Sequence, residues 1–162
     1  MKYRRGFLRN FVFGAEDGLV STVGLLAGVS FAGLGSRYII VSGIILILVE
    51  ALSMAAGAYI SEDSSIDIIT DGKKNSNLIY DSVVMFFSYL LIGLIPLLPY
   101  IFIGDTRVAF YWSLGSTLLA LFSLGLFKGY FLGKPLLLNA FKIAGIGSVV
   151  VGIAVVVGLL LA

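Results

Sequence analysis

The sequence predicts an all-α integral membrane protein with five transmembrane helices, and two observations support this fold class. Of the 162 residues, 59% are hydrophobic and only 12% are charged, a composition typical of membrane proteins with several spans. The apolar residues also gather into five long runs, each at least as long as the roughly 20 residues that a helix needs to cross a bilayer. The charged residues cluster between these runs.

The first span is predicted at residues 10–32, after a basic N-terminal stretch. A signal peptide also begins with basic residues, but this apolar run is too long, contains acids and is followed by four more spans, so we interpret it as a retained helix. Its glycines are four residues apart, with Gly14 paired to Gly18 and Gly24 to Gly28. This spacing predicts close packing against other membrane helices.

The other four spans are predicted at residues 38–60, 81–103, 108–130 and 138–161, which makes residues 1–162 a single transmembrane domain. Residues 61–80 are predicted to form a short acidic cytoplasmic loop. Its acids are Glu62, Asp63, Asp67 and Asp71. Pro96 and Pro99 predict a kink or a helix end in the third span. The small residues of the last two spans are interpreted as helix-packing positions: Gly125, Gly129, Gly133, Gly145, Ser148 and Gly152.

The basic residues predict the orientation of the chain in the membrane. Nine of the eleven fall on the side of the N-terminus: Lys2, Arg4, Arg5, Arg9, Lys73, Lys74, Lys128, Lys134 and Lys142. Arg37 and Arg107 belong to the other side. Because cytoplasmic loops are enriched in Lys and Arg, we expect a cytoplasmic N-terminus and a C-terminus on the opposite face.

The chain has neither cysteine nor histidine, which narrows its chemistry. Without them there is no disulfide, no thiolate metal site and no imidazole proton shuttle. Carboxylates would have to do any metal or proton chemistry, with methionine and backbone oxygens in support. We therefore expect neither an enzyme nor a resident cofactor. The slight positive charge reflects membrane topology and does not indicate nucleic-acid binding.

Two predicted spans carry acidic residues at membrane depth. Asp17, with Glu16 beside it, lies in the first span, and Glu50 lies in the middle of the second. A charge at mid-membrane depth costs roughly 2.5–3.5 kcal/mol on insertion scales, which makes such residues candidates for function. Neither span contains a basic residue to neutralise them. The compensating charge is therefore expected to come from protons or from a bound cation.

Helical periodicity brings these acids towards one candidate metal site. Asp17 shares a helix face with Ser21, and Glu50 shares one with Met54. At 1.5 Å per residue, Asp17 lies about 12 Å beyond Arg9, and Met54 and Glu50 lie about 10 and 16 Å before Ser61. Arg9 and Ser61 are both expected at the cytoplasmic boundary of the membrane. If the two spans pack together, Asp17, Glu50 and Met54 can bind a divalent cation. The thioether favours Fe²⁺ or Mn²⁺ over Mg²⁺ or Ca²⁺.

Other interpretations of these residues stay open. Asp17 could form a hydrogen bond near the start of a helix, and Glu50 could be a protonated packing contact. Met54 could simply fill a gap in the core. Glu16 points about 100° away from Asp17, so it is a weaker candidate, as is Ser21.

Three segments resemble the vacuolar iron transporter family: DGLVSTVGLLAGV from Asp17, EALSMAAGAYIS from Glu50, and GLIPLLPY in the third span. The resemblance implies a homodimer with a translocation path lined by the first helices at the subunit interface. It also implies Asp17, Glu50 and Met54 as metal ligands, and exchange of cytosolic Fe²⁺ or Mn²⁺ for protons. The plasma membrane is the simplest location, and a vacuolar membrane is the alternative.

The chain departs from the iron transporters of this family in one place. Those proteins carry a helical, glutamate-rich cytoplasmic domain between the second and third spans. The roughly 20 residues from 61 to 80 are too few to form it, as in the shorter members of the family. Metal capture by such a domain is therefore not implied for this chain.

Two other functional classes remain open on the sequence. A regulatory or assembly subunit could pair its intramembrane acids with basic residues of a partner, and a carrier for an organic cation could use the same acids. For the transporter, metal would displace protons from buried carboxylates, because metal binding requires the deprotonated ligand. Antiport would then be competition for the same oxygens.

Overall fold

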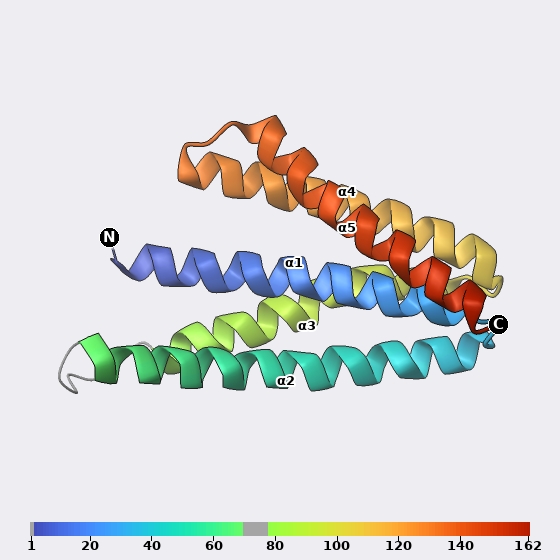
Figure 1. The fold of residues 1–162 in the computed structure, drawn as a ribbon, viewed down its shortest axis with the longest axis horizontal. Coiled ribbons are helices and arrows are strands. Elements are labelled where there is room, and N and C mark those ends of the chain that lie inside the picture. Colours follow the sequence, from blue (N-terminus) through green and yellow to red (C-terminus); the bar gives the residue numbers. More distant parts are fainter. Residues whose placement is uncertain (1, 70–77) are drawn as a thin grey trace.

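The structure, a computed structural model, describes residues 2–69 and 78–162, with side chains at 6–61 and 78–162. It contains five helices: α1 (Lys2–Phe31), α2 (Ser36–Ile69), α3 (Leu78–Phe102), α4 (Thr106–Leu132) and α5 (Leu136–Leu160) (Figure 1). All five are long and apolar enough to cross a membrane. The all-helical class and the five long apolar helices predicted from the sequence are confirmed.

Two helices extend well beyond the predicted spans. The structure starts α1 at Lys2 and continues α2 to Ile69, so that the first part of the predicted loop at residues 61–80 is helical. Backbone hydrogen bonds hold a helix together whether or not its side chains are apolar, so hydropathy marks the membrane boundary and not the helix end. The side chains of Glu62, Asp63 and Asp67, and all of Asp71, lie outside the described residues.

The central helix is α1, which packs against each of the other four. Figure 1 shows α1 and α3 between α2 on one side and the α4–α5 pair on the other. The close approach of α1 to α3 depends on Gly14 and Gly18. A Cβ at Gly18 would lie 2.8 Å from the Tyr89 carbonyl oxygen, and one at Gly14 would lie 2.9 Å from that of Met85. The predicted role of this glycine pair in helix packing is confirmed.

The second pair on α1 packs against α5. Gly24 faces Val150, and Gly28 meets Ala154 and Gly158. Gly125 and Gly129 bring α4 onto α5 in the same way, whereas Gly133 lies in the left-handed cap that ends α4 at φ 63°. The small residues of the middle of α5 are different, because nothing lies within 4 Å of a Cβ built at Gly145 or Gly152.

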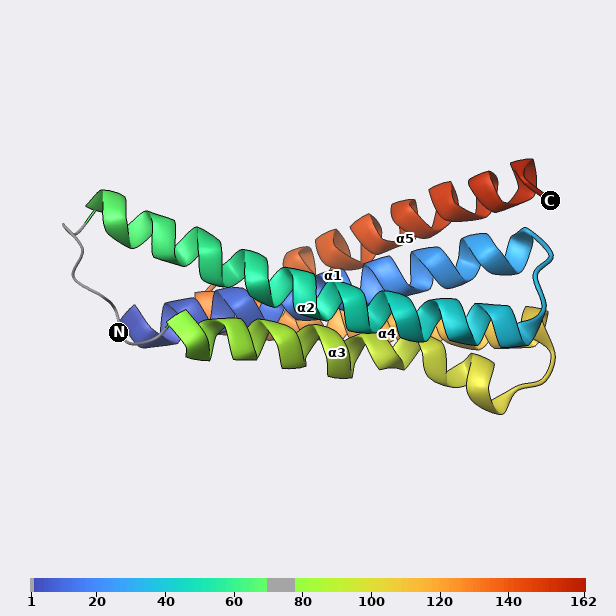
Figure 2. The same ribbon diagram turned by 90° about the horizontal axis from the view of Figure 1, so that it is seen from below.

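The prolines do not end α3, which runs through Pro96 and Pro99 to Phe102 and bends towards that end (Figure 2). Ser113 of α4 donates a buried hydrogen bond to the Pro96 carbonyl oxygen at 2.7 Å. This hydrogen bond links α4 to α3 at the first of the two prolines. Of the two predicted outcomes, a kink or a helix end, α3 therefore shows the kink.

The two ends of the bundle differ in character. One end carries the start of α1, the end of α2, the start of α3 and the α4–α5 connection, and the C-terminus lies at the other (Figure 1). Seven of the nine basic residues assigned to the cytoplasmic side belong to these described segments, whereas Lys73 and Lys74 lie outside the described residues. The largest buried apolar cluster, which includes Leu26, Ile47 and Leu97, lies away from that end and closes the opposite half of the bundle.

Candidate metal site

Asp17 lies on α1 with its carboxylate partly buried. The Ser21 hydroxyl, one helical turn later, donates a hydrogen bond to Asp17 Oδ1 at 3.2 Å. This contact places the two residues on one face, as the helical spacing predicts. No basic side chain in the described ranges forms an ion pair with Asp17. The carboxylate is therefore held by a neutral donor, which fixes its orientation and leaves its charge to be balanced by a proton or a cation.

Tyr89 of α3 is a polar residue at this site that the sequence analysis missed. Its side chain is fully buried, and among the described residues its hydroxyl has no hydrogen-bond partner. The hydroxyl lies close to Ser21 and within electrostatic range of both Asp17 and Glu50. A buried hydroxyl without a partner loses about 1–3 kcal/mol of solvation, so its presence beside two acids suggests a role there. The sequence contains one signal for Tyr89, because a tyrosine in the middle of an apolar span needs a polar partner for its hydroxyl.

Glu50 lies partly buried on α2, with Met54 one turn further along the helix. Its carboxylate acts electrostatically on the Tyr89 hydroxyl of α3, as that of Asp17 does. The structure thus relates the acids of α1 and α2 through a third helix. The described residues contain no cluster of three or more Asp, Glu, His or Cys. A metal bound here would therefore need ligands beyond the two carboxylates.

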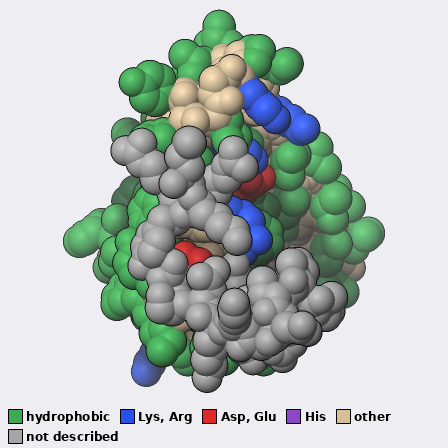
Figure 3. All heavy atoms as spheres, turned by 90° about the vertical axis from the view of Figure 1, so that its left-hand side faces the viewer, with side chains coloured by type: hydrophobic (Ala, Val, Ile, Leu, Met, Phe, Trp, Pro, Cys, Tyr) green, Lys and Arg blue, Asp and Glu red, His purple; other side chains and the backbone are tan. Residues whose placement is uncertain are grey.

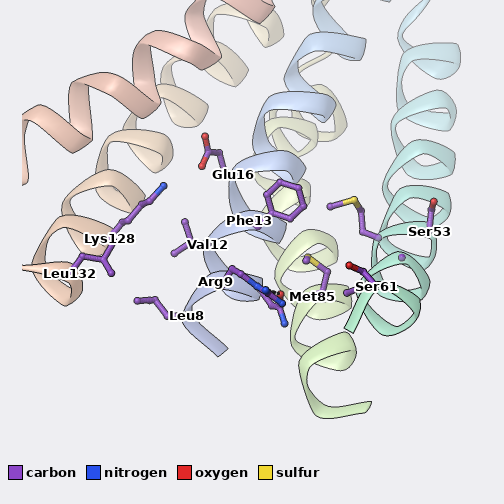
Figure 4. A pocket seen from close by; sticks show the side chains of 14 residues that line it. Leu8, Arg9, Val12, Phe13, Glu16, Ser53, Ser61, Met85, Lys128 and Leu132 are labelled. Atoms are coloured by element: carbon purple, nitrogen blue, oxygen red, sulfur yellow. Dashed lines mark hydrogen bonds between the residues drawn. The ribbon is translucent and has the colours of Figure 1, made fainter. Parts of the chain in front are cut away.

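A large cavity lies at the end of the bundle that carries the N-terminus. Its volume is about 1090 Å³, and α1, α2, α3 and α4 all contribute to its wall. Fourteen residues line it: Leu8, Arg9, Asn10, Val12, Phe13, Glu16, Ser53, Met54, Gly57, Ala58, Ser61, Met85, Lys128 and Leu132 (Figure 4). Figure 3 shows basic and acidic side chains in the middle of the same end.

The cavity stops just short of the two acids. On α1 its wall ends at Glu16, one residue before Asp17, and on α2 it begins at Ser53, three residues after Glu50. Of the predicted site residues, Met54 and Glu16 line the cavity, whereas Asp17, Ser21 and Glu50 do not. Asp17 and Glu50 therefore lie beyond its inner end, between the cavity and the closed half of the bundle.

Comparison with known proteins gives one family. The model of the VIT family matches residues 8–79 and 69–159 of the chain. "Vacuolar iron transporter" of Centaurea cyanus is 28% identical over 202 residues, which cover 88% of this chain and 82% of the relative. "Vacuolar iron transporter 1" of Arabidopsis thaliana is 26% identical, with 88% and 81% covered. "Vacuolar iron transporter homolog 1" of the same plant is 30% identical, with 81% and 70% covered.

The longer alignments also show where the chains differ in length. Alignments over 202 residues exceed the 162 residues of this chain, so those relatives carry additional residues within the matched region. The two parts of the family match overlap at residues 69–79, from the last residue of α2 to the second residue of α3.

Proposed function

The chain belongs to the VIT family, and we propose that it carries Fe²⁺ or Mn²⁺ out of the cytoplasm in exchange for protons. The observation that carries the proposal is the position of Asp17 and Glu50, two intramembrane acids that lie just beyond the inner end of a cavity. A metal that reaches them from the cavity meets carboxylate oxygens, the Tyr89 hydroxyl and, on the cavity side, the Met54 sulfur. Oxygen ligands with one thioether suit a borderline divalent cation.

The exchange follows from the charge of the site. No described basic side chain pairs with Asp17, so the empty carboxylates hold protons and the loaded ones hold metal. A cation entering from the cavity displaces protons, and protons arriving from the other side displace the cation. The structure is open towards the N-terminal end and packed at the opposite end, which is the arrangement of a carrier that faces the cytoplasm if the N-terminus is cytoplasmic. Reversing which end is packed would complete the cycle.

Three further parts of the proposal rest on the family and on the distribution of charge. The N-terminal end faces the cytoplasm, because nine of eleven basic residues belong to it. The working unit is a homodimer, with the partly exposed face of α1 that carries Phe13, Glu16 and Val20 at the interface. The membrane is the plasma membrane, with a vacuolar membrane as the alternative. The short connection between α2 and α3 supports a transporter without a cytoplasmic capture domain.

Metal uptake into proteoliposomes tests this function. Fe²⁺, Mn²⁺, Mg²⁺ and Ca²⁺ are compared with and without an acidic lumen, and we expect Fe²⁺ or Mn²⁺ uptake that the acidic lumen accelerates. Asp17→Asn and Glu50→Gln remove the negative charge while keeping the size of each side chain, and each should reduce uptake to the level of empty liposomes. Asp105→Asn is the matched control, because Asp105 caps α4 outside the spans and Asn is an equally good cap.

Two results would contradict the proposal. Uptake at the native rate by either acid variant would remove that residue from the mechanism. Uptake of no metal under either condition would favour a non-transporting subunit whose acids bind a partner.

A further inference from the structure

The cavity wall contains every sulfur atom of the chain except that of the N-terminal residue. The sequence has three methionines and no cysteine. Met54 from α2 and Met85 from α3 both line the cavity. The two sulfur atoms, from helices far apart in the sequence, thus line the same cavity. Apart from Met1, no other residue of the chain carries sulfur. An ordinary apolar wall could be built from the leucine and isoleucine that fill the rest of these helices.

The surroundings of Met85 orient its sulfur. The side chain is 4% exposed, and a Cβ at Gly14 would lie 3.2 Å from Met85 Sδ. Because Gly14 has no side chain, the sulfur rests against the backbone of α1 where α1 forms the cavity wall. Figure 4 shows Met85 between Arg9 of α1 and Ser61 of α2, both of which line the same space.

A buried amide accompanies the two sulfurs. Asn10 of α1 lines the cavity with 2% exposure, and its Nδ2 has no hydrogen-bond partner among the described residues. Its Oδ1 accepts a long hydrogen bond of 3.4 Å from Arg9 Nε. The cavity therefore has a polar group from α1 that is not saturated, beside thioethers from α2 and α3.

Met54 is already a ligand of the proposed metal site. We propose that Met85 of α3 supplies a second thioether in the cavity, and that this added soft ligand favours Fe²⁺ over Mn²⁺ and Mg²⁺ on the way to Asp17 and Glu50. This inference rests on the proposed function, because it names what discriminates between the transported metals. Thioethers bind soft and borderline cations and interact weakly with hard ones. A neutral thioether also holds a cation loosely, which lets the cation continue towards the carboxylates.

The cavity cannot distinguish Fe²⁺, Mn²⁺ and Mg²⁺ by their size or their charge, so the selection depends on the ligands that it offers. Six waters at about 30 Å³ each give a hydrated cation a volume of roughly 200 Å³, far below the 1090 Å³ of the cavity. Hydrated Fe²⁺, Mn²⁺ and Mg²⁺ therefore all fit. Charged side chains of both signs, those of Arg9, Glu16 and Lys128, line the same cavity. The three cations carry the same charge, so attraction to these side chains does not distinguish them. A cation that stays must gain inner-sphere ligands, and Met54 and Met85 supply the ones that distinguish Fe²⁺.

The ratio of Fe²⁺ to Mn²⁺ uptake by one proteoliposome preparation tests the step. The ratio does not depend on how much protein has folded or inserted. In Met85→Leu and in Met54→Leu we expect the ratio to fall by about threefold, equivalent to roughly 0.65 kcal/mol at 25 °C. Leu98→Ile, on the exposed face of α3 and outside the cavity, should keep the native ratio. A native ratio in Met85→Leu, whatever the result for Met54→Leu, or an equal loss of both metals, would overturn the inference.

X-ray absorption at the iron edge gives a second readout that needs no transport. The purified protein is loaded with Fe²⁺ without oxygen, and sulfur in the first coordination shell can come only from methionine. We expect that sulfur signal in the native protein and its loss in Met54→Leu/Met85→Leu, which retains Met1. A native spectrum without sulfur would refute the thioether step. Sulfur ligation together with an absence of transport would refute the carrier function and leave the binding site standing.

Discussion

Asp17 and Ser21 show at the scale of single residues how a membrane helix can hold an acid. The Ser21 hydroxyl donates to Asp17 Oδ1 from one turn away, so the carboxylate has a fixed orientation before any metal arrives. A donor that orients a metal ligand contributes to affinity without touching the metal, and its loss typically lowers affinity by about 10–100-fold. Ser21 is therefore expected to act on binding more than on the rate at saturation.

Ser21→Ala tests this positioning role. We expect the Fe²⁺ concentration at half-maximal uptake to rise by about tenfold, with the maximal rate largely retained. Ser123→Ala is the matched control, because the Ser123 hydroxyl also bonds one turn back, to the Leu119 carbonyl oxygen, on an exposed face of α4. Uptake curves over a range of Fe²⁺ concentrations measure both quantities. An unchanged half-maximal concentration in Ser21→Ala would remove Ser21 from the site.

The effect of Tyr89→Phe on thermal stability tests whether the Tyr89 hydroxyl serves function or packing. A rise in stability indicates function, and a loss indicates packing. The Tyr89 hydroxyl is buried without a partner in the described structure, so removing it should raise the thermal stability of the metal-free protein, by about 1 kcal/mol. The same variant should take up metal more slowly, because the acids lose the neighbouring oxygen of α3.

Tyr100→Phe provides the contrast. The Tyr100 hydroxyl lies 2.9 Å from Ser30 Oγ, so its removal breaks a made hydrogen bond and should lower stability by about 0.5–1.5 kcal/mol without a specific effect on metal. Thermal unfolding in detergent and uptake in liposomes measure the two effects. Loss of stability in Tyr89→Phe with native uptake would mean that its hydroxyl serves packing.

At the scale of the helices, α1 depends on glycine in order to pack against α3. A Cβ at Gly18 would lie 2.8 Å from the Tyr89 carbonyl oxygen, which real Cβ atoms do not tolerate, so α1 and α3 would have to separate. The carbonyl belongs to the residue whose hydroxyl lies near the acids. Packing and site geometry are therefore coupled at this crossing.

Gly18→Ala is expected to lower the free energy of unfolding by about 1–3 kcal/mol, the usual range for an added methyl in a closely packed contact. It should slow metal uptake as well. Gly115→Ala makes the same change in α4, where nothing lies within 4 Å of the new Cβ, and alanine there should be neutral or stabilising by up to about 1 kcal/mol. Equal effects of the two substitutions on thermal unfolding would show that the α1–α3 contact is not tight.

The helices also show what the sequence could and could not reveal. Hydropathy located all five long apolar helices, and the glycine spacing identified Gly14 and Gly18 as packing positions, because both signals depend on residues close together in the chain. The extension of α2 to Ile69 was missed, since a polar stretch says nothing about where backbone hydrogen bonds stop. At the candidate site, Asp17 and Glu50 were conspicuous as charges among apolar residues. Tyr89 and Met85 were not, because their meaning depends on how α3 packs against α1.

At the scale of the whole molecule, α1 is at once the central helix of the bundle and a helix with an exposed apolar side chain. The helix α1 packs against each of the other four helices, yet its Phe13 is 54% exposed. Glu16 and Val20 continue this partly exposed face along the helix. If the path runs along the first helices of two copies, this face is where the copies meet. The exposed face of α4, with Trp112 at 65%, would then contact lipid.

Single cysteines test this arrangement cleanly, because the chain has none of its own. Phe13→Cys should form a disulfide-linked dimer in native membranes under mild oxidation, since two copies related by a twofold axis near α1 bring residue 13 close to its equivalent. Trp112→Cys should stay monomeric under the same conditions. Non-reducing electrophoresis reads out both variants, and dilution of the protein into excess lipid separates a specific dimer from random collision. Cross-linking at position 112 with none at position 13 would place the interface on α4 and confine each metal path to one protomer.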